Sequence, residues 1–229
     1  MTVAPPWATF DCYGTLVDWV TGMQRAVESL GLDDPDRLLR AYYKLELDVE
    51  RERPGTRYRE ILAETLRRAA ARERIPLPPG GEHVLAERWD DMPVFGDTVP
   101  ALEALRSDGW RLAILTNCDN DLISRTVAML GVDFDLVVTA EDVGSYKPDH
   151  GHWRRFAERT DGQRGFWVHV ACSWVHDIEP ARDLQLPRVW IDRERTGHDP
   201  AIASAVLPNL VPLPETLKGF RPDPELQSD

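Results

Sequence analysis

Short apolar segments recur along the chain, and each is bounded by turn-forming residues. They are residues 8–10, 111–116, 135–139, 166–171 and 188–191. Helical patterns separate most of them. Apolar runs of this length, alternating with helices, are typical of strands in a parallel sheet that is buried on both faces. We therefore predict an α/β fold with a doubly wound, Rossmann-like parallel sheet as its core.

Two helices between these strands can be predicted in detail. Residues 101–106 follow Pro100, which the first turn of a helix accepts. Residues 121–130 carry their larger side chains on one face and stop at Gly131, a suitable residue to end a helix. The tail from Leu213 onward is rich in proline and acidic residues, so we expect it to end the fold with little order.

Residues 18–95 interrupt the alternation of strands and helices. They contain no convincing strand but two long helical patterns, separated by Pro54-Gly55, and residues 76–81 (PLPPGG) form a loop. We predict that residues 18–95 are a helical cap inserted into a core made of residues 1–17 and 96–229.

Composition narrows the classes of partner. The chain has 229 residues and a formal net charge of −12, which disfavours nucleic acid because a phosphate backbone needs a basic surface. A small anionic substrate would need specific donor groups to offset the overall field. We find no apolar run of the ~20 residues that span a bilayer and no signal segment, and three cysteines form no disulfide framework. We therefore expect a cytoplasmic protein without a membrane partner.

Polar residues follow the predicted strands at the points where they end. They are Asp11, Thr116, Asn117, Lys147, Ser173, His176 and Asp177. In open parallel sheets ligands bind outside the carboxyl ends of the strands, so these residues are expected to converge on one pocket. An aspartate presented by a tight glycine turn suggests a nucleophile, because a carboxylate can form a covalent ester.

The order and spacing of these residues resemble the haloacid dehalogenase superfamily over nearly the whole chain. The four motifs read FDCYGTLVD (10–18), LTN (115–117), SYKPD (145–149) and a fourth within 173–177. The resemblance implies a doubly wound core with a helical cap inserted after the first motif, which agrees with the pattern of residues 18–95.

Tyr13 separates two branches of this superfamily. Its phosphatases typically carry a second aspartate at this position as general acid and base, and an unperturbed phenol with a pKa of ~10 is a poor substitute. Asp-x-Tyr-Gly-Thr instead resembles the (S)-2-haloacid dehalogenase (type II) branch, whose halide leaving group needs no proton. This resemblance implies hydrolysis of short 2-haloalkanoic acids, either haloacetate or L-2-haloacids, to 2-hydroxy acids. The reaction would pass through an ester on Asp11 and need no cofactor.

The resemblance also implies roles for the other motif residues. Lys147 holds Asp11 ionised, because an opposite charge within ~4–6 Å favours the carboxylate. Asp177 positions or activates the hydrolytic water, with Ser173 nearby. The substrate carboxylate and halide are bound by Tyr13, Thr15, Arg40, Thr116, Asn117, Trp174 and His176. The helix that begins near Asn120 directs its positive end the same way.

Several positions depart from the branch or stay open. Relatives carry an asparagine where Trp174 stands and an aromatic residue where His176 stands. His176 therefore either favours a small halide, such as fluoride or chloride, or only satisfies backbone groups. The cap arginine that binds halide is assigned to Arg40, although the matching position could fall on Ala41 or Tyr42. Trp153 replaces a tyrosine of relatives and can pack but not hydrogen-bond in the same way.

Other functions remain alternatives. A magnesium-dependent phosphatase would use Asp11, a backbone carbonyl and Asp177 around the metal. A catalytically silent binding protein is less favoured, because buried charges are costly to retain without use. Cys12, Cys118 and Cys172 lie beside the motifs without tight zinc spacing, so we expect them to pack beneath the site. A homodimer is the expected assembly if there is one. Preferred halogen, chain length and enantiomer stay open.

Overall fold

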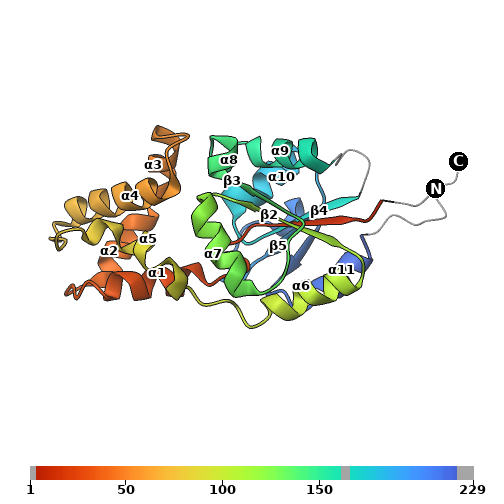
Figure 1. The fold of residues 1–229 in the computed structure, drawn as a ribbon, viewed down its shortest axis with the longest axis horizontal. Helices are drawn as coiled ribbons and strands as arrows, with labels where there is room; N and C mark the ends of the chain where they lie inside the picture. Colours follow the sequence, from red (N-terminus) through yellow and green to blue (C-terminus); the bar gives the residue numbers. More distant parts are fainter. Residues whose placement is uncertain (1–3, 161–165, 221–229) are drawn as a thin grey trace, which may run out of the picture.

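A parallel sheet forms the centre of the molecule. The computed structural model describes residues 4–160 and 166–220. Its six-stranded sheet has the order β3-β2-β1-β4-β5-β6, with all neighbouring strands parallel (Figure 1). The strands are β1 Trp7–Phe10, β2 Arg111–Thr116, β3 Leu136–Thr139, β4 Trp167–Ala171, β5 Arg188–Ile191 and β6 Ala205–Leu207. The prediction of a doubly wound α/β core is confirmed.

The chain winds outward in both directions from β1, which makes β1 the switch point of the sheet. Phe10 lies beside Ile114 of β2 on one side and Val170 of β4 on the other. The residues that follow β1, β2 and β4 therefore emerge next to one another, at the edge where open α/β sheets bind ligands.

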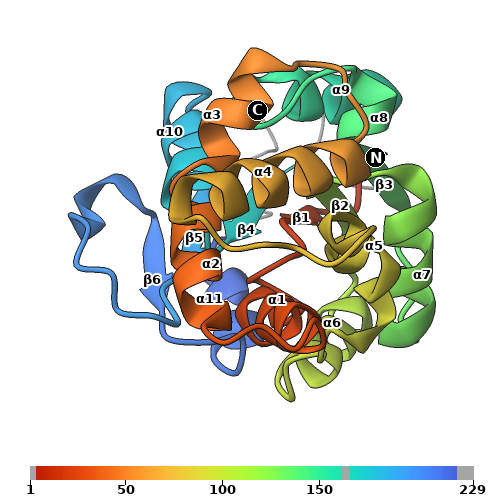
Figure 2. The same cartoon turned by 90° about the vertical axis from the view of Figure 1, so that its left-hand side faces the viewer.

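Helices cover both faces of this sheet. In Figures 1 and 2, α8–α10 lie on one face, and α6, α7 and α11 lie on the other. Their bounds are α6 Thr98–Ser107, α7 Asn120–Leu130, α8 Ala140–Val143, α9 Gly151–Thr160, α10 Glu179–Asp183 and α11 Leu213–Lys218. The central strands β1, β2 and β4 are almost fully buried, as the apolar runs of the sequence predict, whereas the edge strand β6 is partly exposed.

Some predictions for single helices and strands are confirmed and others are wrong. Helix α7 ends at Gly131, whose φ of 64° is the left-handed conformation that glycine adopts easily. The expectation of little order from Leu213 onward is wrong for α11, because Leu213 and Leu217 are fully buried against the core. Residues 221–229 lie outside the described part of the chain. Strand β6 was not predicted, since three residues give too short a pattern.

A group of helices lies over the carboxyl edge of the sheet, apart from the layers that flank it (Figures 1 and 2). These are α1 Trp19–Glu28, α2 Pro35–Tyr43, α3 Glu46–Glu52, α4 Tyr58–Glu73 and α5 Val84–Glu87. Their shared interior includes Leu38, Tyr42 and Ile61, all without exposed surface. We call this group the cap and keep its division from the core at residues 18 and 95 as a proposal.

The two chain segments that connect cap and core run side by side. Val17 forms an antiparallel bridge with Val94, and the Asp18 N–H donates to the Pro93 carbonyl at 2.7 Å. Asp18 also begins α1, because its carboxylate accepts from Thr21 N–H at 3.0 Å. The two connecting segments are thus hydrogen-bonded to each other, and we call them the paired hinge.

Among the described residues, no helix combines the length and apolar character needed to cross a membrane.

Candidate active site

A pocket of about 610 Å³ lies between the cap and the carboxyl edge of the sheet. The core contributes Asp11, Lys147 and Asp177 to its wall, and the cap contributes Trp19 and Glu50. The prediction that the strand-end residues converge on one pocket is therefore supported by their positions.

Asp11 directly follows the buried strand β1 and is held by the turn after it. Thr15 Oγ1 donates to Asp11 Oδ2 at 2.7 Å and accepts from the Cys172 N–H at 2.9 Å. Gly14 makes this turn possible, since its φ is 89° and a Cβ there would lie 2.7 Å from Cys172 Sγ. Thr15 therefore orients Asp11 from behind instead of facing the pocket.

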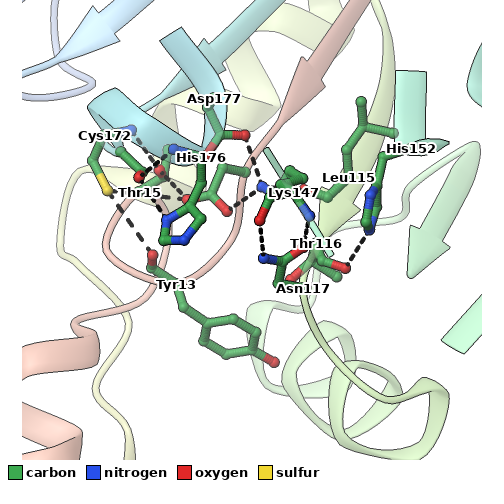
Figure 3. Close-up of polar contacts among 12 residues, drawn as sticks. Tyr13, Thr15, Leu115, Thr116, Asn117, Lys147, His152, Cys172, His176 and Asp177 are labelled. Carbon is green, nitrogen blue, oxygen red and sulfur yellow. Dashed lines mark hydrogen bonds and ion pairs between the residues drawn. The ribbon is translucent and has the colours of Figure 1, made fainter. Parts of the chain in front are cut away.

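Lys147 joins the two catalytic carboxylates predicted from the sequence. Its ammonium donates to Asp11 Oδ1 at 2.9 Å, to Asp177 Oδ1 at 2.7 Å and to the Leu115 carbonyl at 2.9 Å (Figure 3). These contacts use all three N–H donors of a side chain that is 1% exposed. Burial alone would lower the pKa of Lys147, but Asp11 and Asp177 outweigh it and raise that pKa above its ordinary value. Lys147 is thus a fixed cation.

The two carboxylates differ in their environments. Burial raises the pKa of Asp11 above its ordinary value, and the charge of Asp177 adds to this, while Lys147 only partly offsets it. Burial acts on Asp177 too, but Lys147 and His169 outweigh it and bring the pKa of Asp177 down to about 2. Asp177 is therefore the firmly ionised member of the pair, and Asp11 is the more basic and poorly solvated one.

His169, in the middle of β4, supports Asp177 from the core side. Its Nε2 lies 2.9 Å from Asp177 Oδ1, which can only accept, so Nε2 carries the hydrogen. Nδ1 lies 2.9 Å from the Thr9 hydroxyl, which in turn accepts from the Trp167 indole N–H at 2.8 Å. This chain fixes Asp177 Oδ1. Asp177 lines the pocket, and its Oδ2 is buried without a hydrogen-bond partner in the part of the chain that the structure describes.

Thr116 is the last residue of β2 and Asn117 is the next residue, and their side chains make different contacts. The Asn117 amide binds the backbone of Lys147, donating from Nδ2 to the carbonyl at 3.0 Å and accepting from the N–H at 2.7 Å. Asn117 therefore positions Lys147, and its second amide hydrogen points toward Glu50 Oε1 at 3.5 Å. Thr116 also lines the pocket, and its Oγ1 is buried without a hydrogen-bond partner among the described residues.

Tyr13 points away from the catalytic carboxylates (Figure 3). Its hydroxyl accepts from the Trp89 indole N–H at 3.0 Å and lies 2.9 Å from Thr126 Oγ1. Burial raises the pKa of this phenol well above its ordinary value. Tyr13 lines the pocket, but its hydroxyl is hydrogen-bonded to Trp89 and Thr126. The bond to Trp89 connects the first motif with residues 18–95.

Glutamates of α3 form the cap wall opposite the core. Glu46 Oε1 accepts from the Tyr42 and Tyr58 hydroxyls at 2.8 and 2.7 Å. Burial and the neighbouring Glu50 raise the pKa of Glu46 to about 7. Glu50 is 4% exposed, and its Oε2 lies 3.5 Å from His176 Nε2. The cap thus presents acidic groups where an anionic substrate would enter.

His176 and Ser173 belong to the π-helical turn Trp174–Ile178 that carries Asp177. Ser173 Oγ begins this turn by accepting from the His176 N–H at 3.2 Å, and it also lies 3.0 Å from His176 Nδ1. Both ring nitrogens of His176 therefore face protein groups. These groups are the side chains of Ser173 and Glu50, and the prediction that His176 favours a small halide stays a prediction.

The structure also shows the positions of three residues whose roles the sequence left open, namely Arg40, Trp174 and Trp153. Arg40 is exposed and does not line the pocket, because α2 turns Leu39 and Ala41 inward on either side of it, so its assignment to the halide is corrected. Trp174 lines the pocket and stacks on His198 with ring centroids 4.6 Å apart. Trp153 packs edge-on against His169 at 5.4 Å, which is consistent with a packing role.

The cysteines lie at and beneath the site as free thiols. Cys12 and Cys118 are fully buried, and Cys172 reaches the pocket with Sγ 4.0 Å from Asp11 Oδ2. Within residues 4–160 and 166–220, no three His, Cys, Asp or Glu side chains are grouped as a metal site requires.

Sequence reasoning missed His169, Glu46 and Glu50. The histidine was visible within the strand FWVHVA, where a polar residue inside an apolar run is a signal of a buried partner. The glutamates carry no comparable signal, since their function depends on the tertiary approach of α3 to the sheet.

The sequence matches the model of the haloacid dehalogenase-like hydrolase family over residues 7–181. A (S)-2-haloacid dehalogenase of Pseudomonas sp. (strain YL) is 26% identical over 220 residues, which cover 92% of this chain and 94% of that protein. Haloacetate dehalogenase H-2 of Moraxella sp. (strain B) is also 26% identical, covering 89% of this chain and 95% of that protein.

Solved structures share the fold. The L-2-haloacid dehalogenase of Xanthobacter autotrophicus with chloropropionic acid covalently bound has a TM-score of 0.80 at 17% identity, covering 93% of this chain and 98% of that one. L-2-haloacid dehalogenase RSc1362 has a TM-score of 0.81 at 24% identity, covering 94% and 99%. Sheet, flanking helices and cap together therefore have close structural counterparts.

Proposed function

This chain belongs to the haloacid dehalogenase-like hydrolases, and from that premise we propose that it hydrolyses the carbon–halogen bond of short 2-haloalkanoic acids. The substrates are haloacetate or an L-2-haloacid, and the product is the 2-hydroxy acid. The Pseudomonas relative is a (S)-2-haloacid dehalogenase and the Moraxella relative is a haloacetate dehalogenase, which supports this reaction class.

Asp11 is the proposed nucleophile. One of its oxygens bonds to C2 of the substrate while the carbon–halogen bond breaks, and the halide leaves with the electron pair. Burial of Asp11 to 7% exposure strips water from the carboxylate, which makes it a stronger nucleophile than a solvated one. Lys147 and Thr15 keep it in one orientation, with contacts of 2.9 and 2.7 Å.

Asp177 is the proposed base for the second step. A water molecule adds to the Asp11 carbonyl carbon, gives a proton to Asp177 Oδ2, and the bond from that carbon to the ester oxygen breaks. Asp177 passes this proton to the departing hydroxy acid, and the second proton of the water is released to solvent. Asp11 becomes a carboxylate again and keeps one oxygen of the water. The unpartnered Oδ2, next to an Oδ1 already held by Lys147 and His169, supports this assignment.

The observation that favours carbon over phosphorus is Tyr13. A phosphate ester needs a proton for its leaving alcohol, and Tyr13 directs its hydroxyl to Trp89 and Thr126 instead. The space between the carboxylates of Asp11 and Asp177, where the phosphatase alternative places a metal, is bridged by the Lys147 ammonium. Both features weigh against the phosphatase.

A substrate panel tests the proposal. Wild-type protein is incubated with fluoro-, chloro- and bromoacetate, with L- and D-2-chloropropionate and with generic phosphate esters, each with and without a chelator. We expect halide release that the chelator does not change and that Asp11→Asn abolishes. Chelator-sensitive phosphate release would replace the proposal with the phosphatase, and no release from any substrate would point to a silent protein.

The same panel addresses the halogen preference. If His176 acts on the leaving group at all, His176→Ala changes the ratio of fluoroacetate to bromoacetate turnover. Equal ratios in both proteins would limit His176 to the arrangement of its neighbours.

A further inference from the structure

A line of polar groups crosses from the cap to the fourth motif. It starts at Glu50 on α3, passes through the His176 imidazole and ends at Ser173, with separations of 3.5 Å and 3.0 Å. All three residues line the pocket, and Glu50 and His176 come from different parts of the chain. Nothing in the reaction proposed above requires Glu50 or His176, so their arrangement needs its own explanation.

The hydrogens on His176 can be assigned from its neighbours. Nε2 lies 3.5 Å from Oε2 of the Glu50 carboxylate, which only accepts, and neither atom has a hydrogen-bond partner among the described residues apart from this long ionic contact. Nε2 therefore carries a hydrogen. Nδ1 faces a hydroxyl, which can accept or donate, so the second ring hydrogen decides how Ser173 behaves.

Ser173 has two lone pairs and one hydrogen to distribute. Its Oγ already accepts from the His176 backbone N–H at 3.2 Å. When Nδ1 carries a hydrogen, the second lone pair of Oγ is filled as well, and the O–H must donate away from the turn into the pocket. When Nδ1 has lost its hydrogen, the O–H turns back to Nδ1 and the pocket loses a donor.

We propose that Glu50 and His176 are positioning residues that hold the Ser173 hydroxyl as a hydrogen-bond donor to an anionic ligand in the pocket. This rests on the proposed function for the identity of the ligand, whose acceptor is the carboxylate or the halogen of the substrate. We call Glu50, His176 and Ser173 the relay. The relay supplies a hydrogen-bond donor to an anion in a pocket that Arg40 does not reach.

The charges around His176 favour the donating state. Burial lowers the pKa of His176, but Glu50 outweighs it and raises that pKa above the ordinary value. Asp177 acts in the same direction, and Lys147 opposes it. Glu46, on the same helix as Glu50, also interacts electrostatically with His176. Because the pKa of His176 is raised, Ser173 keeps donating to the pocket at higher pH than beside an ordinary histidine, and it stops as the pH rises through that pKa.

Two non-reacting probes test the relay with the intact protein. Sodium acetate and sodium bromide are titrated from pH 5.5 to pH 9, and binding is followed by the fluorescence of the pocket tryptophans Trp19 and Trp174. We expect an affinity for at least one anion that falls with rising pH in wild type. Ser173→Ala should weaken that affinity by about tenfold at pH 6 and remove most of the pH dependence, which is the effect of losing one hydrogen bond to a charged group. Acetate and bromide separate a carboxylate subsite from a halide subsite.

A second readout follows His176 itself and does not depend on turnover. Nitrogen-15 NMR of the histidine rings gives the pKa and tautomer of His176, with its signals assigned by their loss in His176→Asn. Glu50→Gln should lower the pKa of His176 and move the fall in anion affinity to lower pH. The matched control is Glu52→Gln on the same helix, whose carboxylate faces Arg68 and solvent and which should change neither property.

The outcomes are distinguishable from those of the proposed function. Anion binding that is equal in wild type and Ser173→Ala, absent in wild type, or unchanged in pH profile by Glu50→Gln would overturn the relay. Binding and titration as expected, without halide release from any haloacid, would leave the relay standing and overturn the proposed reaction.

Discussion

Glu46 offers a quantitative test of the acidic cap wall. The change is Glu46→Gln, which keeps an oxygen for the Tyr42 and Tyr58 hydroxyls but cannot titrate. In the folded protein burial and Glu50 raise the pKa of Glu46 to about 7, whereas an unfolded glutamate titrates near its ordinary value of 4.5. The folded state therefore holds a proton between these values that the unfolded state has released.

The sign and size follow from this difference. Wild-type stability contains a cost that is absent below pH 4.5, grows as the pH rises, and is complete above pH 7. At about 1.4 kcal/mol per pH unit the full difference is about 3 kcal/mol, and partial exposure of Glu46 to the pocket reduces it, so we expect about 1–3 kcal/mol. The free energy of unfolding of Glu46→Gln should thus rise relative to wild type by this amount between pH 4.5 and pH 8.

Urea unfolding at a series of pH values provides the assay. Titrating groups that do not interact with Glu46 contribute equally to both proteins and cancel in the difference, provided that the urea dependence is the same. Glu52→Gln, an exposed glutamate on the same helix, is the control and should show a difference that stays within about 0.5 kcal/mol at all pH values. A flat difference for Glu46→Gln, or one that falls with pH, would refute the assignment of Glu46 as a buried carboxyl with a raised pKa.

Two substitutions test the charged cluster. Lys147→Met leaves Asp11 and Asp177 buried without their shared cation, so the free energy of unfolding at pH 7.5 should fall by about 3–5 kcal/mol, and an unchanged urea midpoint would contradict the buried bridge. His169→Leu removes the donor behind Asp177 Oδ1, and we expect slower ester hydrolysis, seen by mass spectrometry as protein carrying the acid adduct during turnover. His169→Gln can still present an N–H to Asp177 and should accumulate less adduct; equal accumulation in both variants would show that His169 acts only through packing.

The sheet could be predicted from the sequence because its strands are local, strongly apolar and bounded by turns. Asp11, Lys147 and Asp177 could be placed together for the same reason, since strand ends in a parallel sheet share an edge. Strand β6 could not, because Ala205–Leu207 is too short and too exposed to stand out from a loop.

The sequence predicted that the cap is helical, but it did not predict which side chains of the cap line the pocket. Which face of α2 and α3 meets the core depends on how the paired hinge at Val17 and Val94 orients the cap, and no local pattern contains that angle. Arg40 was therefore assigned to the pocket from resemblance, while Glu46 and Glu50 went unnoticed. Ser173 and His176 were recognised as neighbours of Asp177, but the π-helical turn that Ser173 begins, and their mutual hydrogen bond within it, were not predicted.

The covalent ester on Asp11 is the central claim of the proposed mechanism, and isotope labelling tests it most directly. A single turnover is run in oxygen-18 water with enzyme in excess over chloroacetate or L-2-chloropropionate, and protein and product are analysed by mass spectrometry. If the ester forms, one oxygen-18 atom is expected in the peptide that contains Asp11 and none in the hydroxy acid. Label in the hydroxy acid, with Asp11 unlabelled, would mean that water attacks the substrate directly and would contradict the ester.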